Sequence, residues 1–200
     1  SMLDQFGSKN TKDGMPMINF YWADKMVEWA QQNNIKVRGH VLVWDAYMTD
    51  WYFREGYDSS RPYADRETMR LRTRYYIDQV VTHFEEKFPG TIYCWDVVNE
   101  AVADNSSNLR SSNWTKVVGQ DFVNRAFEYA RKYAPATTKL YYNDYSTPYE
   151  PKLTGICNLL DSLIADGTIG RVAETAACQA KFEREGVGAT ISVTSCLSLI

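Results

Sequence analysis

Short apolar segments and amphipathic helices alternate along this chain, and that alternation restricts its fold more than any other feature. The apolar segments at 36–44, 91–98 and 138–142 predict strands. Apolar residues at spacings of three and four predict helices over 24–32, 66–88, 121–133 and from 153 to near 167. Strands and helices that alternate at a period of about fifty residues form parallel pairs with right-handed crossovers. We therefore expect an α/β protein whose strands are buried on both faces.

Polar and aromatic side chains collect where each predicted strand ends. His40 and Trp44 close the first strand, Asn99 and Glu100 follow the second, and Asn-Asp-Tyr at 143–145 follows the third. Each group alone has a local explanation, because Asn caps helices well and Asn-Asp-Tyr is an ordinary turn. All three together favour a single cavity, since α/β barrels carry their chemistry at the carboxyl ends of parallel strands.

Composition and charge exclude several other classes of protein. The 200 residues are enough for one domain with a core, and the net charge of -3 comes from intermixed acidic and basic residues. No basic stripe points to nucleic acid, and no apolar run reaches the length of a membrane span. Four cysteines without a CxxC pair, and only two histidines, give no ligand set for a metal. We expect no metal and no cofactor.

Aromatic residues are abundant, at 14% of the chain, with six Trp and fourteen Tyr. Trp51, Tyr52 and Phe53 lie in a predicted long loop at 45–62, and a second polar loop is predicted at 103–113. Two interpretations stay open. The rings fill a large core, or exposed rings form platforms for a flat apolar ligand such as the face of a sugar.

Three motifs in the chain resemble glycoside hydrolase family 10, the xylanases. RGHVLVW at 38–44, WDVVNEAV at 95–102 and LYYNDY at 140–145 are similar to the third, fourth and fifth strands of that family, in the same order. The resemblance covers about 3–169. It implies a (β/α)8 TIM-type barrel, a β-1,4-linked xylan or xylo-oligosaccharide as ligand, and hydrolysis with retention of anomeric configuration.

The resemblance also implies roles for the residues at the strand ends. Glu100 matches the general acid/base, which protonates the leaving oxygen and later activates water. Asn99 matches the amide that binds the sugar 2-hydroxyl, a contact that strengthens in the oxocarbenium-like transition state. Because Asn99 and Glu100 follow a buried strand directly, both side chains would reach the cavity. We expect Glu100 in a cleft close to Asn99 and His40.

The remaining ligand-binding positions come from the first and third strands. His40 and Trp44 match residues that hold and floor the subsite on the non-reducing side. Asn143 and Tyr145 match residues that line the cleft after the fifth strand. A histidine in an apolar strand is more often a core residue, but the neighbours of His40 favour a binding role.

The C-terminal segment departs from the family. Retaining hydrolysis needs a second carboxylate, the nucleophile, about 5–5.5 Å from the first. The segment FEREGVGATISVTSCLSLI at 182–200 resembles the end of a helix followed by the seventh strand, which places Ser195 at the nucleophile position. No Asp or Glu follows Glu185. We therefore expect poor hydrolysis of xylan by this chain.

Other departures suggest an incomplete barrel. The segment 170–179 is too short for the sixth-strand region, Asp45 stands where the family has His, and the family's first two strands would precede Ser1. We expect a partial barrel at 1–169 and a divergent C-terminal segment of the same domain at 170–200. A truncation, a frameshift and a decayed paralogue all fit the sequence.

These departures leave alternative functions open. The chain is a retaining endo-1,4-β-xylanase or part of one, a non-hydrolytic xylan-binding or interaction protein derived from one, or another retaining glycosidase of the same barrel class. A partial barrel exposes unpaired strand edges, so an oligomer or poor solubility is expected. The resemblance further implies secretion or export to the periplasm, although no signal peptide is recognisable in the sequence.

Overall fold

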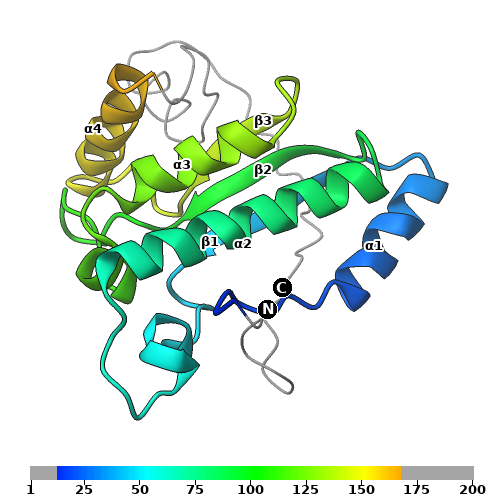
Figure 1. Cartoon of the computed structure of the whole chain (residues 1–200). Helices are drawn as coiled ribbons and strands as arrows, with labels where there is room; N and C mark the ends of the chain where they lie inside the picture. The colour runs from blue at the N-terminus through cyan, green and yellow to red at the C-terminus, as the bar shows by residue number, and fades with distance from the viewer. Residues whose placement is uncertain (1–12, 168–200) are drawn as a thin grey trace.

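Three parallel strands form one sheet in the computed structural model, which describes residues 13–167. They are β1 (Val37–Trp44), β2 (Ile92–Asn99) and β3 (Lys139–Asn143). The order is β1-β2-β3, and both neighbouring pairs are parallel (Figure 1). Each strand lies within one residue of its predicted position at both ends. The predicted parallel α/β arrangement is therefore confirmed for this part of the chain.

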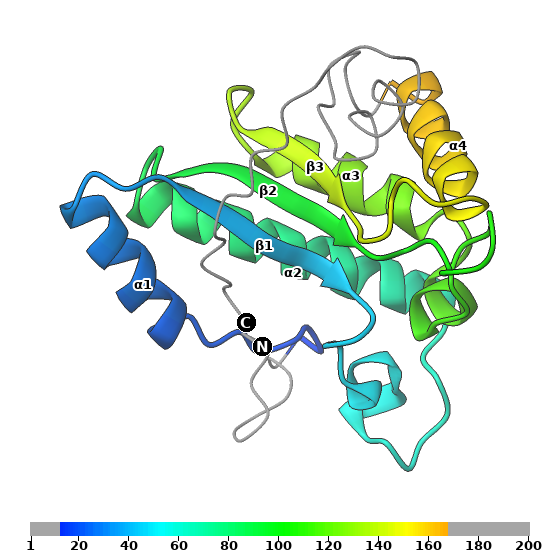
Figure 2. The same ribbon diagram turned by 180° about the vertical axis from the view of Figure 1, so that it is seen from behind.

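Within residues 13–167, four α-helices accompany the sheet. They are α1 (Tyr21–Gln32), α2 (Arg66–Lys87), α3 (Phe122–Tyr133) and α4 (Lys152–Ala165). Helices α2 and α3 cover one face of the sheet, and the view from behind shows the strands in front of them (Figure 2). Helix α2 begins where predicted because the side chain of Asp65 accepts a hydrogen bond from the backbone N–H of Thr68, at 2.9 Å.

Helix α1 begins three residues before the predicted start at position 24. Its first turn carries Tyr21 and Trp22, which are 58% and 75% exposed. These large apolar residues point away from the core, so they do not continue the periodicity that marks the buried residues Ala23, Val27 and Ala30. The apolar pattern therefore identified the buried face of this helix and missed its first turn.

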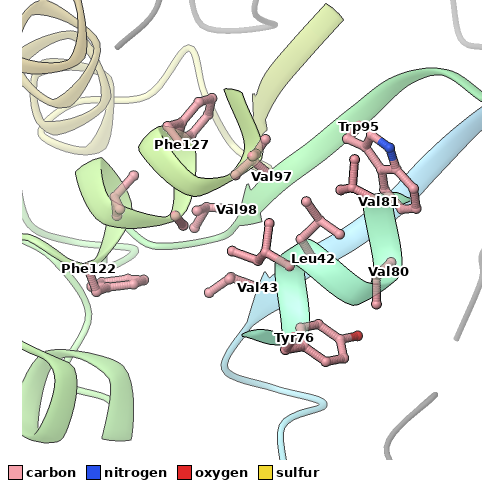
Figure 3. Packing of buried hydrophobic residues seen from close by; sticks show 14 of the residues in the cluster. Leu42, Val43, Tyr76, Val80, Val81, Trp95, Val97, Val98, Phe122 and Phe127 are labelled. Atoms are coloured by element: carbon pink, nitrogen blue, oxygen red, sulfur yellow. The ribbon is translucent and has the colours of Figure 1, made fainter. Parts of the chain in front are cut away.

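The core lies between the sheet and the helices that cover it. Figure 3 shows Leu42 and Val43 of β1 facing Val80 and Val81 of α2. A second group joins Trp95, Val97 and Val98 of β2 to α2 and to Phe122 and Phe127 of α3. Burial of each such side chain contributes about 1.5–3 kcal/mol relative to exposure. The core thus lies on the face of the sheet that α2 and α3 cover, and the opposite face is left to polar residues.

The aromatic segment at 51–53 belongs to this core. It forms a short 3₁₀ helix, Asp50–Phe53, in which Trp51, Tyr52 and Phe53 are all buried. Arg72 of α2 holds the segment, because its Nη1 donates to the backbone oxygens of Tyr52 and Arg54, each at 2.8 Å. For these three rings the core interpretation is correct, and a ligand platform at 51–53 is excluded.

Within residues 13–167 the sheet is open, with β1 and β3 as its edges. In this part of the chain, no helix is both long enough and apolar enough to span a membrane. The predicted seventh-strand segment at 182–200, Ser195 and the proposed boundary near 169 lie outside the described residues.

A glycine at the centre of β1 allows the close approach of Trp95. Gly39 pairs with Trp95 across the sheet, and a Cβ at Gly39 would lie 2.2 Å from Cε3 of that indole. We expect Gly39→Ala to lower the free energy of unfolding by about 1–3 kcal/mol, because the buried ring cannot move without disturbing the core. Urea unfolding followed by far-UV circular dichroism measures this loss.

Gly90→Ala is the matched control, since a Cβ at Gly90 meets nothing within 4 Å. It introduces only the cost of a left-handed backbone for a non-glycine residue, about 1 kcal/mol. A Gly39→Ala variant with the wild-type unfolding midpoint would contradict the steric argument.

Candidate active site

The register of the sheet brings the predicted site residues together. Trp44 of β1 pairs with Asn99 of β2, and Asn99 pairs with Asn143 of β3. Nearer the start of the strands, His40 pairs with Asp96. Three strands therefore end at one level, and their last residues form the floor of a common site.

Glu100 is the first residue after β2, and its carboxylate lies against the first strand. Oε2 of Glu100 accepts a hydrogen bond from the indole Nε1–H of Trp44, at 3.2 Å. The backbone of Glu100 is left-handed, with φ of 55°. A non-glycine residue held there costs on the order of 1–3 kcal/mol, so the surrounding contacts must impose it.

Two backbone contacts hold Glu100 in this conformation. Its N–H donates to the backbone oxygen of Asn143 at 2.9 Å, and its own oxygen accepts from Nε of Arg110 at 3.3 Å. The carboxylate is thus aimed by β3 and by Arg110, as well as by Trp44. Glu100 is half-buried, which leaves it accessible to a ligand.

A buried carboxylate orients His40. Nδ1 of His40 lies 2.9 Å from Oδ2 of Asp96, whose side chain is 1% exposed. Asp96 also accepts from Arg38, with Nη2 at 2.6 Å from Oδ1. The His40 ring lies 5.6 Å from the Trp44 ring, centroid to centroid. Trp44 therefore lies between His40 and Glu100 and contacts both.

The two asparagines form a pair at the centre of the site. Nδ2 of Asn143 donates to Oδ1 of Asn99 at 2.8 Å, and Asn99 is buried. Oδ1 of Asn143 lies 3.5 Å from Nη2 of Arg38. Fixed amides next to a carboxylate can bind the hydroxyl groups of a ligand and orient them toward Glu100.

Tyr145 lies at the outer side of the site, and the residue is 45% exposed. Arg110 donates to its hydroxyl at 3.4 Å, and Nζ of Lys152 lies 3.8 Å from the ring centroid. Together with Asp104, these cations form an ionic cluster next to Glu100. Hydrogen bonds from Tyr145, Lys152 and Arg110 hold the pKa of Asp104 well below its usual value of 3.8.

The structure brings together the six residues predicted from the sequence, His40, Trp44, Asn99, Glu100, Asn143 and Tyr145, and adds charged groups that the prediction did not include. Arg38 and Asp96 lie within the first two motifs, and an Asp inside an apolar strand is a signal that could have been used. Arg110 and Lys152 gave no such signal, because each lies in a segment that reads as an ordinary loop or helix start. Ser195, the residue at the predicted nucleophile position, lies outside the described part of the chain.

The parallel strands, their helices and the carboxylate with paired amides at one strand end define a protein of the α/β-barrel class. The chain belongs to glycosyl hydrolase family 10, whose sequence pattern matches residues 6–180. That family folds as a (β/α)8 barrel, and the open three-stranded sheet is part of such a barrel. The predicted fold class and family are confirmed.

Comparison with known members of the family shows what share of a whole protein this chain matches. A putative endo-1,4-beta-xylanase of Caldicellulosiruptor saccharolyticus is 40% identical over 169 residues, which are 84% of this chain and 54% of that protein. Endo-1,4-beta-xylanase A of Thermotoga neapolitana is 43% identical over 160 residues, 79% of this chain and 14% of that protein. The chain therefore spans about half the length of the first relative and much less of the second.

Solved structures of xylanases are likewise matched over only part of their length. An N-terminal endo-1,4-beta-D-xylanase of Clostridium thermocellum, complexed with xylohexaose, superposes with a TM-score of 0.75 at 32% identity. The match covers 84% of this chain and 35% of that one. An intracellular xylanase of Thermoanaerobacterium saccharolyticum, as a mutant complexed with xylotriose, gives a TM-score of 0.69 at 38% identity and covers 76% of this chain and 47% of its own.

The ionic cluster predicts a specific dependence of stability on pH. Because the pKa of Asp104 is lowered in the folded state, its contribution to stability is complete above the usual value of 3.8 and is lost as the pH falls toward the folded pKa. We expect the free energy of unfolding of the wild type to fall more steeply than that of Asp104→Asn between about pH 4 and about pH 2.

Urea titrations at several pH values provide the measurement. Glu86→Gln removes an exposed carboxylate of α2 outside the cluster and is the control. If the free energy of unfolding falls equally with pH in the wild type and in Asp104→Asn, the cationic neighbours do not stabilise the Asp104 carboxylate, and the prediction is wrong.

Proposed function

We propose that this chain provides the acid/base side of a retaining endo-1,4-β-xylanase site, with Glu100 as the general acid/base. The observation that carries the proposal is the hydrogen bond from Trp44 to the Glu100 carboxylate, next to the Asn99–Asn143 amide pair. The named relatives and the solved xylo-oligosaccharide complexes support the same substrate class.

The proposed mechanism assigns each residue one task. Glu100 gives its proton to the glycosidic oxygen as the bond to the anomeric carbon breaks, and later takes a proton from the attacking water. Asn99 binds the sugar 2-hydroxyl, and Asn143 fixes the orientation of Asn99 through their hydrogen bond. The indole of Trp44 offers its face to the sugar on the non-reducing side, where His40 is oriented by Asp96.

The nucleophile is the missing part of this proposal. The resemblance of 182–200 to the seventh strand of the family puts Ser195 at its position, and no carboxylate follows Glu185 in the sequence. A serine hydroxyl is a weak nucleophile without an adjacent base, and it carries no charge to stabilise an oxocarbenium ion. Loss of such a group typically slows the reaction on the order of a thousandfold or more.

This gap also favours a second candidate function. A chain that keeps the binding residues but lacks the nucleophile can bind xylan without cleaving it. In this case His40, Trp44 and Asn99 act as a recognition surface only. Binding of xylo-oligosaccharides with no release of reducing sugar from xylan, in the presence or absence of an added nucleophile, distinguishes this candidate from the first. Release from cellulose instead of xylan would indicate another glycosidase of the same class.

Turnover of an aryl xylobioside tests the proposed roles. We expect little turnover in buffer, and an increase of about tenfold or more after addition of azide or formate, because an external nucleophile would supply the missing catalytic group. The small anion would attack the anomeric carbon in place of the missing carboxylate. Glu100→Gln should reduce the rescued rate for substrates with poor leaving groups, because they require the acid most.

Glu86→Gln, which changes an exposed carboxylate on α2, is the control for this experiment. Fast turnover without any added anion, abolished by Glu100→Gln, would show that another carboxylate acts as nucleophile. Glu183, Glu185 or a residue from a second chain would then be the candidates.

The open sheet leads to a prediction about assembly. In residues 13–167, β1 and β3 each have a strand partner on one side only, and unpaired edges favour association between chains. We expect the purified protein to form oligomers or aggregates whose mass rises with concentration. Light scattering across a dilution series measures this, and a constant monomer mass over the series would contradict it.

A further inference from the structure

A buried lysine lies beneath the exposed ring of Tyr145. Lys152, the first residue of α4, has a fully buried side chain, at 0% exposure. Its ammonium is 2.7 Å from Oδ1 of Asp144, 3.0 Å from Oδ1 of Asp104 and 3.8 Å from the centroid of the Tyr145 ring. The mechanism described above gives this lysine no task.

Arg110 links the same ring to the acid/base residue. Its Nη2 lies 3.2 Å from Oδ1 of Asp104 and 3.4 Å from the hydroxyl of Tyr145. Its Nε donates to the backbone oxygen of Glu100 at 3.3 Å. One guanidinium therefore spans the distance between Tyr145 and the backbone of Glu100.

Asp144 extends the connection to the residues that follow Glu100. Its Oδ2 accepts a hydrogen bond from the hydroxyl of Tyr142. That hydroxyl accepts in turn from the backbone N–H groups of Ala101 and Val102, at 3.0 Å and 3.2 Å. Lys152 thus holds Asp144, Asp144 holds Tyr142, and Tyr142 holds the backbone immediately after Glu100.

The cluster is electrically balanced, with two cations, Lys152 and Arg110, against two carboxylates, Asp104 and Asp144. Burial alone would lower the pKa of Lys152, but its hydrogen bonds to Asp144 and Asp104 raise it, so the lysine stays charged at neutral pH. A charged ammonium is attracted to the face of an aromatic ring and restricts where that ring can lie.

Stability alone is a weak explanation for such a cluster. Replacement of a buried ion pair by apolar residues of similar size is often neutral or stabilising, so a buried lysine is better explained by what it orients. Here the group it orients is the one ring of the cluster that remains exposed. One face of the Tyr145 ring contacts Lys152, and Tyr145 as a residue is 45% exposed.

We infer that Lys152 and Arg110 are positioning residues that hold the Tyr145 ring as a platform for a sugar unit next to Glu100. The same two cations fix the backbone from the carbonyl group of Glu100 to Val102, Arg110 directly and Lys152 through Asp144 and Tyr142. The ligand class is a pyranose with an apolar face, as in a xylo-oligosaccharide. The inference rests on the proposed function for its ligand, whereas the restraint on the ring does not depend on any ligand.

The restraint on the ring is tested first, in the full chain and without ligand. Tyrosine rings labelled with ¹³C give NMR signals, and Tyr145→Phe identifies the signal of Tyr145. In Lys152→Met, which keeps the length of the side chain and removes its charge, the Tyr145 signal should move toward that of Tyr149, a tyrosine 69% exposed. Lys132→Met is the control, because Lys132 lies 5.6 Å from a different ring, that of Tyr133.

Ligand binding is tested second, by calorimetric titration with xylohexaose. We expect Lys152→Met and Tyr145→Ala each to weaken binding by about tenfold. The first variant releases the Tyr145 ring from its restraint, and the second deletes the ring, so neither presents an ordered ring to the ligand. Lys152→Arg, which keeps the cation, should restore part of the loss. Tyr149→Ala changes an exposed tyrosine outside the cluster and should bind as the wild type does.

The outcomes separate this inference from the proposed function. No binding of xylohexaose by the wild type would refute the proposed function and the sugar platform, while the NMR signal still tests the restraint on Tyr145. An unchanged Tyr145 signal in folded Lys152→Met overturns the inference, and so does wild-type affinity in that variant. If Lys152→Met does not fold, Arg110→Gln replaces it, and the same two results apply.

Discussion

The parallel register of β1, β2 and β3 is the constraint on which the site depends. His40 pairs with Asp96, and Trp44 pairs with Asn99. From the first pair to the second, β1 therefore advances by four residues while β2 advances by only three. In a regular strand Asp96 and Asn99 would face opposite sides, because side chains alternate. The irregularities after His40 and after Asp96 remove this conflict. Arg38 contacts both Asp96 and the Asn99–Asn143 pair, which shows that all of them serve one side of the sheet.

Charge neutralisation is the second requirement of the site. Asp96 and Lys152 are both buried, and each has two partners of opposite or potentially opposite charge. An unpaired charge at either position would carry a large desolvation cost. The pairs therefore let the strand ends carry polar groups at fixed positions. The predicted binding residues His40, Asn143 and Tyr145 each contact one of these charged groups.

The sequence predicts some parts of this structure better than others, for physical reasons. Buried strands produce continuous apolar runs, so β1, β2 and β3 were located closely, and the polar residues after them marked the site. The first turn of α1 was missed because Tyr21 and Trp22 are exposed, and the rings at 51–53 could not be assigned because loop residues show no period. Lys152 and Arg110 could not be found, since a lysine at a helix start is usually exposed and only its partners in space make it a buried group.

The residues that hold Glu100 all come from the described part of the chain. Trp44 holds the carboxylate, Asn143 and Arg110 hold its backbone, and Tyr142 holds the two residues that follow. None of these contacts requires a strand beyond β1 or β3. The geometry around Glu100 is therefore set by β1, β2, β3 and Arg110, independently of the residues that a further strand of the barrel supplies. On the proposed assignment of Glu100 as the general acid/base, sugar recognition and bond cleavage depend on different strands and can be lost independently.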